Sequence, residues 1–533
     1  MSASTFATMA SASPAAPDGD ALLPVRYKGL LTFAIMMAMM MQILDTTIAN
    51  VALPHMQTSL GATIDTIAWV LTSYIVATAV AIPITGWLAD RVGSRNLFLW
   101  SVAFFIVTSM LCGAATSLEQ MVTFRIMQGI AAAFIGPISQ TAMLDINPSH
   151  KHGNAMAIWS LGAVMGPILG PLIGGYITEY YNWRWVFYVN LPLGAMILAM
   201  LYFLLPSRPI AKRGFDLFGF SMFALGLAAL QLVLDRGQQL DWLESTSIWI
   251  GIGCIIIGFW VFIVHMMTGK NTLLTPAIFT DRNLVGSLIF VALVGVIIFA
   301  IIALIAPMLQ GVLGYPVLSA GILLAPRGLG VIVAMGIAAR LMNSVDARIL
   351  LAIGWAIIAW SCYMMTHWTI GMDSGPVITV GIIQGLGIGF IFVPLNVIAF
   401  ATLPVSLRPE GAALMNLLRN VGASIGISIT ASNVARNLQI SHADLAENIT
   451  ASTLPSLGLE RLNLHADQIA MLLNSEINRQ ALMIGYINNF WLIMWGCIIA
   501  VPASMLLKKL PKTGTAVLVD DELPPEAEPQ PAD

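Results

Sequence analysis

Long apolar stretches separated by short polar segments run along almost the whole chain. A helix of about 18 to 25 apolar residues is long enough to cross a hydrocarbon layer of roughly 30 Å. Because an even number of such helices returns the chain to its starting side, both ends are expected on one side of the membrane. The pattern predicts fourteen membrane-spanning helices, at about residues 29–53, 67–89, 97–116, 120–143, 154–177, 185–205, 217–234, 247–267, 284–309, 318–340, 349–367, 376–402, 411–435 and 483–507.

The basic residues between the spans are distributed unequally. Most of the 24 Lys and Arg residues fall on the side of the chain ends, a few fall on the opposite side, and Arg125, Arg327 and Arg419 lie within spans. Cytoplasmic loops of membrane proteins carry the excess of Lys and Arg. Both termini are therefore predicted to be cytoplasmic.

The composition is typical of an all-α integral membrane protein, since 58% of the 533 residues are hydrophobic and only 10% are charged. The net charge of −3 and the scattered basic residues indicate no nucleic-acid partner. The sequence contains no phosphate-binding loop, no His-Glu-x-x-His motif and no paired cysteines, so we expect no enzymatic activity, metal or cofactor. Uphill transport would draw on an ion gradient or on a separate energy-coupling subunit. Residues 1–27, rich in Ala, Ser and Pro, and residues 511–533 are predicted to be cytoplasmic tails.

Asp45 is the only carboxylate placed well inside a long apolar stretch. Ionisable residues inside a membrane are costly and usually mark a pathway. Such a carboxylate either couples proton uptake to another process or forms a structural salt bridge that holds the helices together.

Arg125 lies in the fourth span, about five residues from its outer end, and Asp45 lies about nine residues from the outer end of the first. These positions correspond to depths of roughly 8 Å and 13 Å, so we expect the two side chains to pair if their helices touch. An arginine would favour the charged carboxylate and burial would favour the neutral one. Protonation could then depend on conformation, as a coupling site requires.

Glycines recur at every fourth position of the fifth span, which also contains prolines. Small residues at this spacing let another helix approach closely, and prolines allow bending. The strip is either a sliding contact of a moving helix or a static packing groove. Its residues are Gly162, Gly166, Pro167, Gly170, Gly174 and Gly175.

A short charged turn with glycines joins the second and third spans, and it has a weaker echo after the tenth span, at residues 336–348. The echo favours two related halves, as in transporters built from repeats, although the turn alone could be a charged anchor at the membrane surface. The residues of interest are Gly86, Asp90, Arg91, Gly93 and Arg95.

Several other polar side chains within spans are candidates for a substrate cavity, because buried polar groups must face protein or water. Arg327 could equally cap a helix end. The candidates are Gln128, Gln384, Asn396, Asn416, Arg419, Asn420 and Arg327.

Residues 436–482 form the one long segment between spans, and they are predicted to lie outside. His465 to Ala481 carries Ile and Leu at helical spacing, which predicts an amphipathic helix. The segment is either a surface cap or a docking surface for a partner.

Together these motifs resemble the major facilitator superfamily, and more narrowly its fourteen-span drug:proton antiporters of the EmrB/QacA type. The resemblance covers residues 28–507. It rests on residues 44–54, 86–95, Arg125 with Gly129, the Gly-Pro run of the fifth span and the stretch 182–192. Residues 234–242 and the long outer segment favour the EmrB-like members. Arg327 departs from the EmrB pattern, although other fourteen-span members are similar at residues 326–328.

The resemblance implies a major facilitator fold, with six-helix bundles at 28–205 and 284–510 and two extra helices in a linker at 206–283. It also implies proton-driven export of hydrophobic compounds across a bacterial inner membrane, with Asp45 as proton carrier and Arg125 as its partner. EmrB-like pumps work with an EmrA-like periplasmic adaptor and a TolC-like outer-membrane channel, so the segment 436–482 becomes a docking candidate. Two alternatives remain, namely a transporter of one metabolite on the same fold and a non-transporting receptor or scaffold.

Overall fold

The computed structural model describes residues 21–207, 214–269, 272–342, 344–447 and 465–509, and these residues form helices and loops without strands. Fourteen helical segments in them are long and apolar enough to cross a membrane, which confirms the predicted number and fold class. The first half contains α1 (Lys28–Ser59), α2 (Ile64–Ile67), α3 (Trp69–Ala81), η1 (Ile82–Ile84), α4 (Thr85–Val92), α5 (Ser94–Ala114), α6 (Leu118–Asp145), η2 (Ser149–Lys151), α7 (His152–Tyr180), α8 (Trp185–Tyr188) and α9 (Asn190–Leu204).

The inserted pair of helices and the second half of the chain contain the remaining helices. They are α10 (Leu217–Arg236), η3 (Trp242–Glu244), α11 (Thr246–Thr268), η4 (Pro276–Thr280), α12 (Arg282–Val294), η5 (Gly295–Phe299), α13 (Ala300–Pro307), η6 (Met308–Val312), α14 (Val317–Leu324), α15 (Pro326–Leu341), α16 (Ala347–Met365), α17 (Ser374–Ala401), η7 (Val405–Leu407), α18 (Arg408–Glu447), α19 (Ala466–Ala503) and η10 (Ser504–Leu506).

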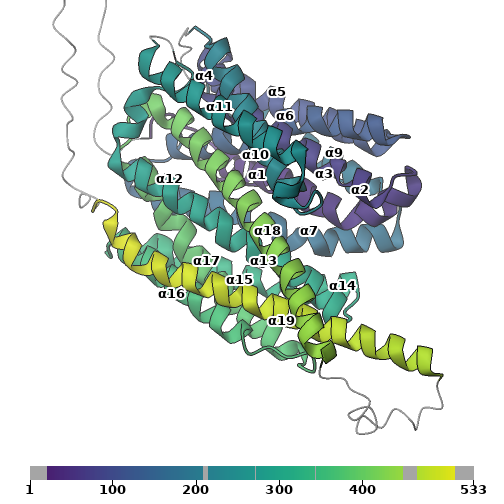
Figure 1. Ribbon diagram of the computed structural model, residues 1–533. Coiled ribbons are helices and arrows are strands. Elements are labelled where there is room, and N and C mark those ends of the chain that lie inside the picture. Colours follow the sequence, from purple (N-terminus) through teal and green to yellow (C-terminus); the bar gives the residue numbers. More distant parts are fainter. Residues whose placement is uncertain (1–20, 208–213, 270–271, 343, 448–464, 510–533) are drawn as a thin grey trace, which may run out of the picture.

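The helices pack as two groups (Figure 1). In the first half α1 packs along α7, and α6 packs against α3 and α5. In the second half α17 lies between α15 and α16, and α18 packs against α12 and α19. The pair α10 and α11 is inserted between the halves in sequence, and α10 contacts both α3 and α18. The extra helices therefore cover one side of the seam, whereas α7 meets α14, α15 and α17 on the other. The exact residue limits of the domains stay a prediction.

The ninth span is continuous but irregular. Two π-helical turns, η5 and η6, interrupt it between α12 and the loop before α14. An ideal Cβ at Gly295 in η5 would lie 2.3 Å from the carbonyl oxygen of Arg419, so the turn packs directly on the backbone of α18. π-turns inside helices often occur at functional sites.

The last two spans are longer than predicted. Residues 436–447 continue α18, and residues 466–482 belong to α19, so much of the segment expected between them is helical. The amphipathic helix predicted over 465–481 exists, but as the first turns of α19. Asn437 accepts a 2.7 Å hydrogen bond from Asn488, and His442 lies 2.9 Å from the side-chain oxygen of Asn474. The first pair joins the base of the α18 extension to α19, and the second joins the two extensions as an antiparallel arm. Residues 448–464 lie outside the described part.

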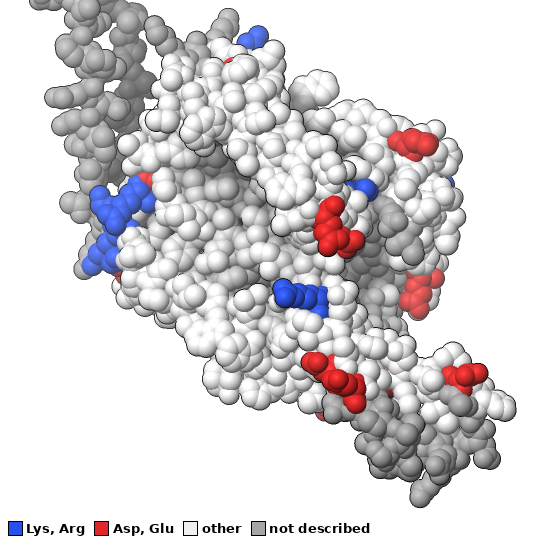
Figure 2. All heavy atoms as spheres, in the orientation of Figure 1, with Lys and Arg blue, Asp and Glu red and all other residues white. Residues whose placement is uncertain are grey.

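Charged side chains gather toward the two ends of the helices, with a broad uncharged surface between them (Figure 2). Basic residues are grouped near the described chain ends, and acidic residues dominate the opposite end of this view. We call the end that carries Lys28 and residue 509 the terminal face. The distribution is that of a protein surrounded by lipid along its length.

Candidate functional site

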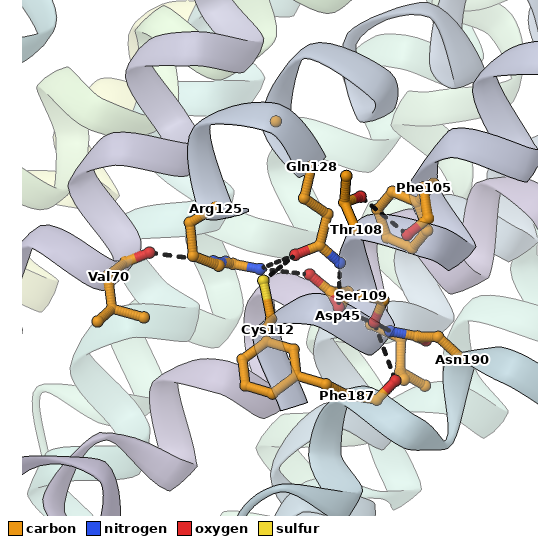
Figure 3. A network of polar contacts seen from close by, with 12 residues as sticks. Asp45, Val70, Phe105, Thr108, Ser109, Cys112, Arg125, Gln128, Phe187 and Asn190 are labelled. Carbon is orange, nitrogen blue, oxygen red and sulfur yellow. Dashed lines mark hydrogen bonds and ion pairs between the residues drawn. The ribbon is translucent and has the colours of Figure 1, made fainter. Parts of the chain in front are cut away.

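A fully buried ion pair lies inside the first half, between α1 and α6 (Figure 3). Arg125 Nη1 donates a 2.7 Å hydrogen bond to Asp45 Oδ2, and neither side chain is exposed. Asp45 Oδ1 accepts from Gln128 Nε2 at 3.0 Å and from Asn190 Nδ2 at 2.7 Å. The carboxylate therefore has three donors from two further helices, which compensate the cost of burying its charge.

Arg125 is oriented by more than the carboxylate. Its Nε donates to the carbonyl oxygen of Val70 at 3.0 Å, and Nη1 also donates to Gln128 Oε1 at 2.8 Å. The guanidinium lies 4.2 Å from the ring centroid of Tyr74, within the range of a cation–π contact. Gly129 makes this possible, because its ideal Cβ would lie 2.6 Å from the carbonyl oxygen of Tyr74 and would keep α6 away from α3.

The predicted contact between Asp45 and Arg125 is thus present, whereas the part played by Asn190 was not predicted. Asn190 follows an aromatic stretch and begins α9, and its amide also donates to Ser109 Oγ at 3.0 Å. An asparagine between Val189 and Leu191 in an apolar run was the available signal. Spacing along the sequence does not reveal which of several buried polar residues faces Asp45.

The network fills most of the acceptor capacity of the carboxylate. Asp45 Oδ1 accepts two hydrogen bonds and Oδ2 accepts one from the described residues, so one of the roughly four acceptor positions of a carboxylate is left over. Three polar atoms around it, Arg125 Nη2, Asn190 Oδ1 and Tyr74 Oη, are buried without a hydrogen-bond partner among the described residues. Such spare donors and acceptors permit a rearranged set of hydrogen bonds when helices move.

The glycine strip of α7 faces α1, the helix that carries Asp45. An ideal Cβ would lie 2.5 Å from the carbonyl oxygen of Met36 at Gly162, and 2.0 Å from Thr47 Oγ1 at Gly170. Gly166 and Gly174 face α1 in the same way, whereas Gly175 faces Val317 of α14. The close approach predicted from the spacing is confirmed, and Pro167 lies within the same α7 segment.

A second polar cluster joins the halves. Gln140 on α6 donates to Asn396 Oδ1 at 2.8 Å and accepts from Asn416 Nδ2 at 3.0 Å. Asn416 also hydrogen-bonds Arg419, whose guanidinium lies 5.5 Å from the centroid of the Trp159 ring. We call Gln140, Asn396, Asn416 and Arg419 the seam cluster. Gln140 was not predicted as part of it.

The halves also meet at the terminal face. An ideal Cβ at Gly86 would lie 2.7 Å from Glu410 Cγ, so α4 approaches the start of α18 closely. Glu410 is buried and accepts from Thr275 N and Oγ1 at 3.0 and 3.1 Å. Arg408 lies 3.8 Å from Asp145 at the end of α6. Glu410 and Asp145 are buried carboxylates that hydropathy did not reveal, because they stand at helix ends.

The remaining residues of the charged turn lie at the end of α4 and the start of α5. Gly93 has a φ of 88°, a backbone conformation that favours glycine, and it separates α4 from α5. Arg95 donates to the carbonyl oxygen of Tyr202 at 2.6 Å, and Arg91 lies 5.4 Å from the Trp87 ring centroid. Asp90 lies on α4 in the same turn.

The seven cavity candidates do not form one group. Gln128 belongs to the Asp45 network, and three others belong to the seam cluster. Arg327 on α15 and Gln384 on α17 are buried in a third place, and Asn420 is half-buried on α18.

Two helical bundles that meet along a seam of glycines and polar residues, with a charge pair buried in one bundle, are typical of membrane transporters built from repeats. The chain belongs to the Major Facilitator Superfamily, whose sequence model matches residues 35–427.

Within this family the chain is similar to multidrug export protein EmrB of Escherichia coli K12, with 34% identity over 472 residues that cover 87% of this chain and 92% of the relative. EmrB of Haemophilus influenzae is 34% identical over 88% of this chain and 93% of its own. The fatty acid resistance protein FarB of Neisseria gonorrhoeae is 32% identical over 85% of this chain and 91% of its own.

Solved structures share the fold at low sequence identity. The human organic anion transporter MFSD10 superposes with a TM-score of 0.56 at 12% identity, over 88% of this chain and 99% of its own. The proton:xylose symporter XylE gives a TM-score of 0.56 at 13% identity, over 90% of this chain and 99% of its own.

Proposed function

We propose that the protein is a proton-coupled antiporter that exports hydrophobic and amphipathic toxicants. The observation that carries this proposal is the fully buried Asp45 carboxylate, which is held by Arg125, Gln128 and Asn190 at the depth of the membrane. The names of the EmrB relatives support drug export as the direction and cargo class. Its energy source would be the proton gradient.

Proton binding would be coupled to helix movement because α1 makes two contacts at once. One side of α1 carries Asp45 into the network, and another packs on the glycine strip, where Thr47 Oγ1 donates to the carbonyl oxygen of Gly166 at 3.2 Å. A shift of α7 against α1 would therefore move the carboxylate relative to its donors. Proton binding would favour one arrangement of the bundles and proton release the other.

The proposed location is a bacterial inner membrane with both termini in the cytoplasm. The excess of Lys and Arg at the terminal face supports this orientation. In this orientation the seam cluster and the contact between Gly86 and Glu410 lie in the cytoplasmic half of the membrane. In the described conformation the two helical bundles therefore contact each other on the cytoplasmic side.

The deciding experiment is drug-induced proton release from protein reconstituted in liposomes, comparing wild type with Asp45→Asn. Wild type should exchange drug for protons, and Asp45→Asn should bind drug without exchange. Asp235→Asn is the matched control, because Asp235 lies at the end of α10 and hydrogen-bonds Thr72 outside the network. If Asp45→Asn still couples, Asp45 is structural. If wild type exchanges nothing, a uniporter or a scaffold explains the protein better.

The alternative of a dedicated exporter has support in the name of FarB, which states resistance to one class of compound. A deletion strain tested against structurally unrelated toxicants separates the two. Broad hypersensitivity supports multidrug export, and loss of tolerance to a single class supports the dedicated exporter.

We further propose that the arm formed by residues 436–447 and 466–482 docks an EmrA-like adaptor, which would connect the pump to a TolC-like outer-membrane channel. Two observations support this proposal: the arm continues the helices of two spans, and its surface exposes Ile440, Met471 and Leu472. A variant lacking residues 440–475 should keep drug–proton exchange in liposomes but lose co-purification of a co-expressed EmrA-like adaptor. Retained co-purification would refute the docking role.

A further inference from the structure

Arg327 is a buried cation that has no counter-charge among the described residues. Its side chain is 3% exposed, and within the described residues it makes no hydrogen bond or ion pair, with Nε fully enclosed. Arg125, by contrast, has a carboxylate, an amide oxygen and a carbonyl oxygen. An uncompensated guanidinium inside a membrane protein costs several kcal/mol. Arg327 therefore needs an acceptor that the described chain does not supply.

A second unpartnered group lies on the neighbouring helix. Gln384 on α17 is 2% exposed, and both its amide oxygen and its amide nitrogen lack partners among the described residues. Gly381 and Gly385 lie one turn apart on one face of α17, and Gln384 lies beside this face, at i+3 from Gly381. An ideal Cβ would lie 4.0 Å from Arg327 Cβ at Gly381 and 2.1 Å from the Arg327 carbonyl oxygen at Gly385. The guanidinium and the amide thus come from helices that touch at this level.

The level is the middle of the membrane. Arg327 lies ten residues after Val317, where its span begins, and Gln384 lies ten residues after Ser374. At a rise of 1.5 Å per residue, both are roughly 15 Å deep. Substrate sites of transporters with paired bundles lie near this depth, at the contact between the repeats.

The site also borders the first half. The residue after Arg327 is Gly328, where an ideal Cβ would lie 3.4 Å from Met165 Sδ and 3.8 Å from Ile168 Cδ1 of α7. α7 is the helix whose glycine strip packs on α1. A ligand at Arg327 would therefore lie near α7, where the second half contacts the first.

Charge favours an acid there. Among the described residues of the second half, carboxylates stand only at helix ends, in loops or in the arm, whereas Arg327 and Arg419 are both buried within spans. A guanidinium has five donors and no acceptor, and it matches a carboxylate in a two-point geometry.

We propose that Arg327 and Gln384 form the subsite that binds the acid group of an amphipathic substrate, with the guanidinium paired to the carboxylate and the Gln384 amide donating a further hydrogen bond. This assignment rests on the proposed export function and specifies its substrate class. Amphipathic acids are preferred over their neutral analogues, and cations are disfavoured by the uncompensated positive charge.

The test compares binding of decanoate and of decanamide, which differ at the acid group, to the protein in nanodiscs at pH 7.5. Wild type should bind decanoate more tightly. Arg327→Gln should weaken decanoate binding about tenfold or more, since hydrogen bonds to charged groups are the stronger ones, and should leave decanamide binding nearly unchanged. Arg340→Gln, on the exposed side of the same helix, is the matched control.

Equal binding of the two compounds by wild type, or an unchanged acid-to-amide ratio in Arg327→Gln, overturns the assignment. If Arg327→Gln does not fold, Gln384→Leu is tested in its place, and its ratio of decanoate affinity to decanamide affinity must be lower than that of wild type. A purely structural role would weaken both ligands together, which also overturns the assignment. The result is separable from the export proposal, because binding is measured without a gradient and drug–proton exchange is scored independently with wild type in liposomes.

Discussion

Replacing Gly170 by alanine tests whether α1 and α7 must touch for transport. The added Cβ would lie 2.0 Å from Thr47 Oγ1, whereas ordinary contact begins at 3.4 Å, so the neighbouring groups have to give way by about 1.4 Å. Turning Thr47 aside has a cost, because its single hydroxyl hydrogen is shared between the carbonyl oxygens of Leu44 at 2.9 Å and of Gly166 at 3.2 Å. The strain therefore falls on the helix contact itself.

The expected loss of stability follows from two opposing effects. Overpacking a well-packed contact costs about 1–3 kcal/mol. Alanine offsets about 0.5–1 kcal/mol of this, because glycine is the poorer helix former. We expect Gly170→Ala to lower the apparent Tm in detergent by a few degrees. Drug–proton exchange should fall more strongly, because Asp45 lies only two residues before Thr47 on the displaced helix.

Two further variants separate this strain from a general effect of alanine. Gly336→Ala, on α15, meets nothing within 4 Å and should keep both stability and exchange. Thr47→Ala combined with Gly170→Ala removes the nearest atom and should recover part of the lost Tm. The reasoning fails if Gly170→Ala behaves like Gly336→Ala in both assays, since the glycine strip would then not be a tight contact.

Three other predictions test separate parts of the structure. Asn190→Leu removes one donor to the buried carboxylate and should slow drug-induced proton release while drug binding persists; an unchanged rate would show that this donor is dispensable. Cysteines introduced at Gly153 and Met342 should form a disulfide that stops transport until it is reduced. An ideal Cβ at Gly153 lies 3.5 Å from Met342 Cβ, within the usual range for the two Cβ atoms of a disulfide. Absence of cross-linking under oxidation would argue against this contact. The hydrogen bond from the Arg348 side chain holds the pKa of Asp346 below its usual range. The charged carboxylate therefore stabilises the fold at pH values above its unfolded pKa, and this stabilisation is lost as the pH falls. Between pH 7 and pH 3 the Tm of Asp346→Asn should fall less than the Tm of wild type, and an equal fall would contradict this role of Asp346.

The two ends of the last loop show where pattern reasoning was incomplete. Hydropathy ended the thirteenth span near residue 435 and began the last near 483, because the flanking residues are polar. The structure continues both helices, since Asn437 with Asn488 and His442 with Asn474 satisfy polar groups between them. A helix needs no apolar environment once a neighbouring helix supplies its contacts.

The sequence alone determined the number of spans, the similar depths of Asp45 and Arg125 and the closely packed face of α7. These features follow from local rules, because the length of an apolar run, the depth of a charge along it and the spacing of glycines can each be measured within one helix. Only the tertiary structure decided that Asp45 and Arg125 touch, that Asn190 rather than another polar residue completes the carboxylate's contacts, and that Gln140 joins the halves. It alone also showed that Arg327 and Gln384 have no hydrogen-bond partners among the described residues. Many helices carry polar groups at the same depth, and which of them meet depends on how the helices pack and rotate, which the order of residues along a single span does not specify.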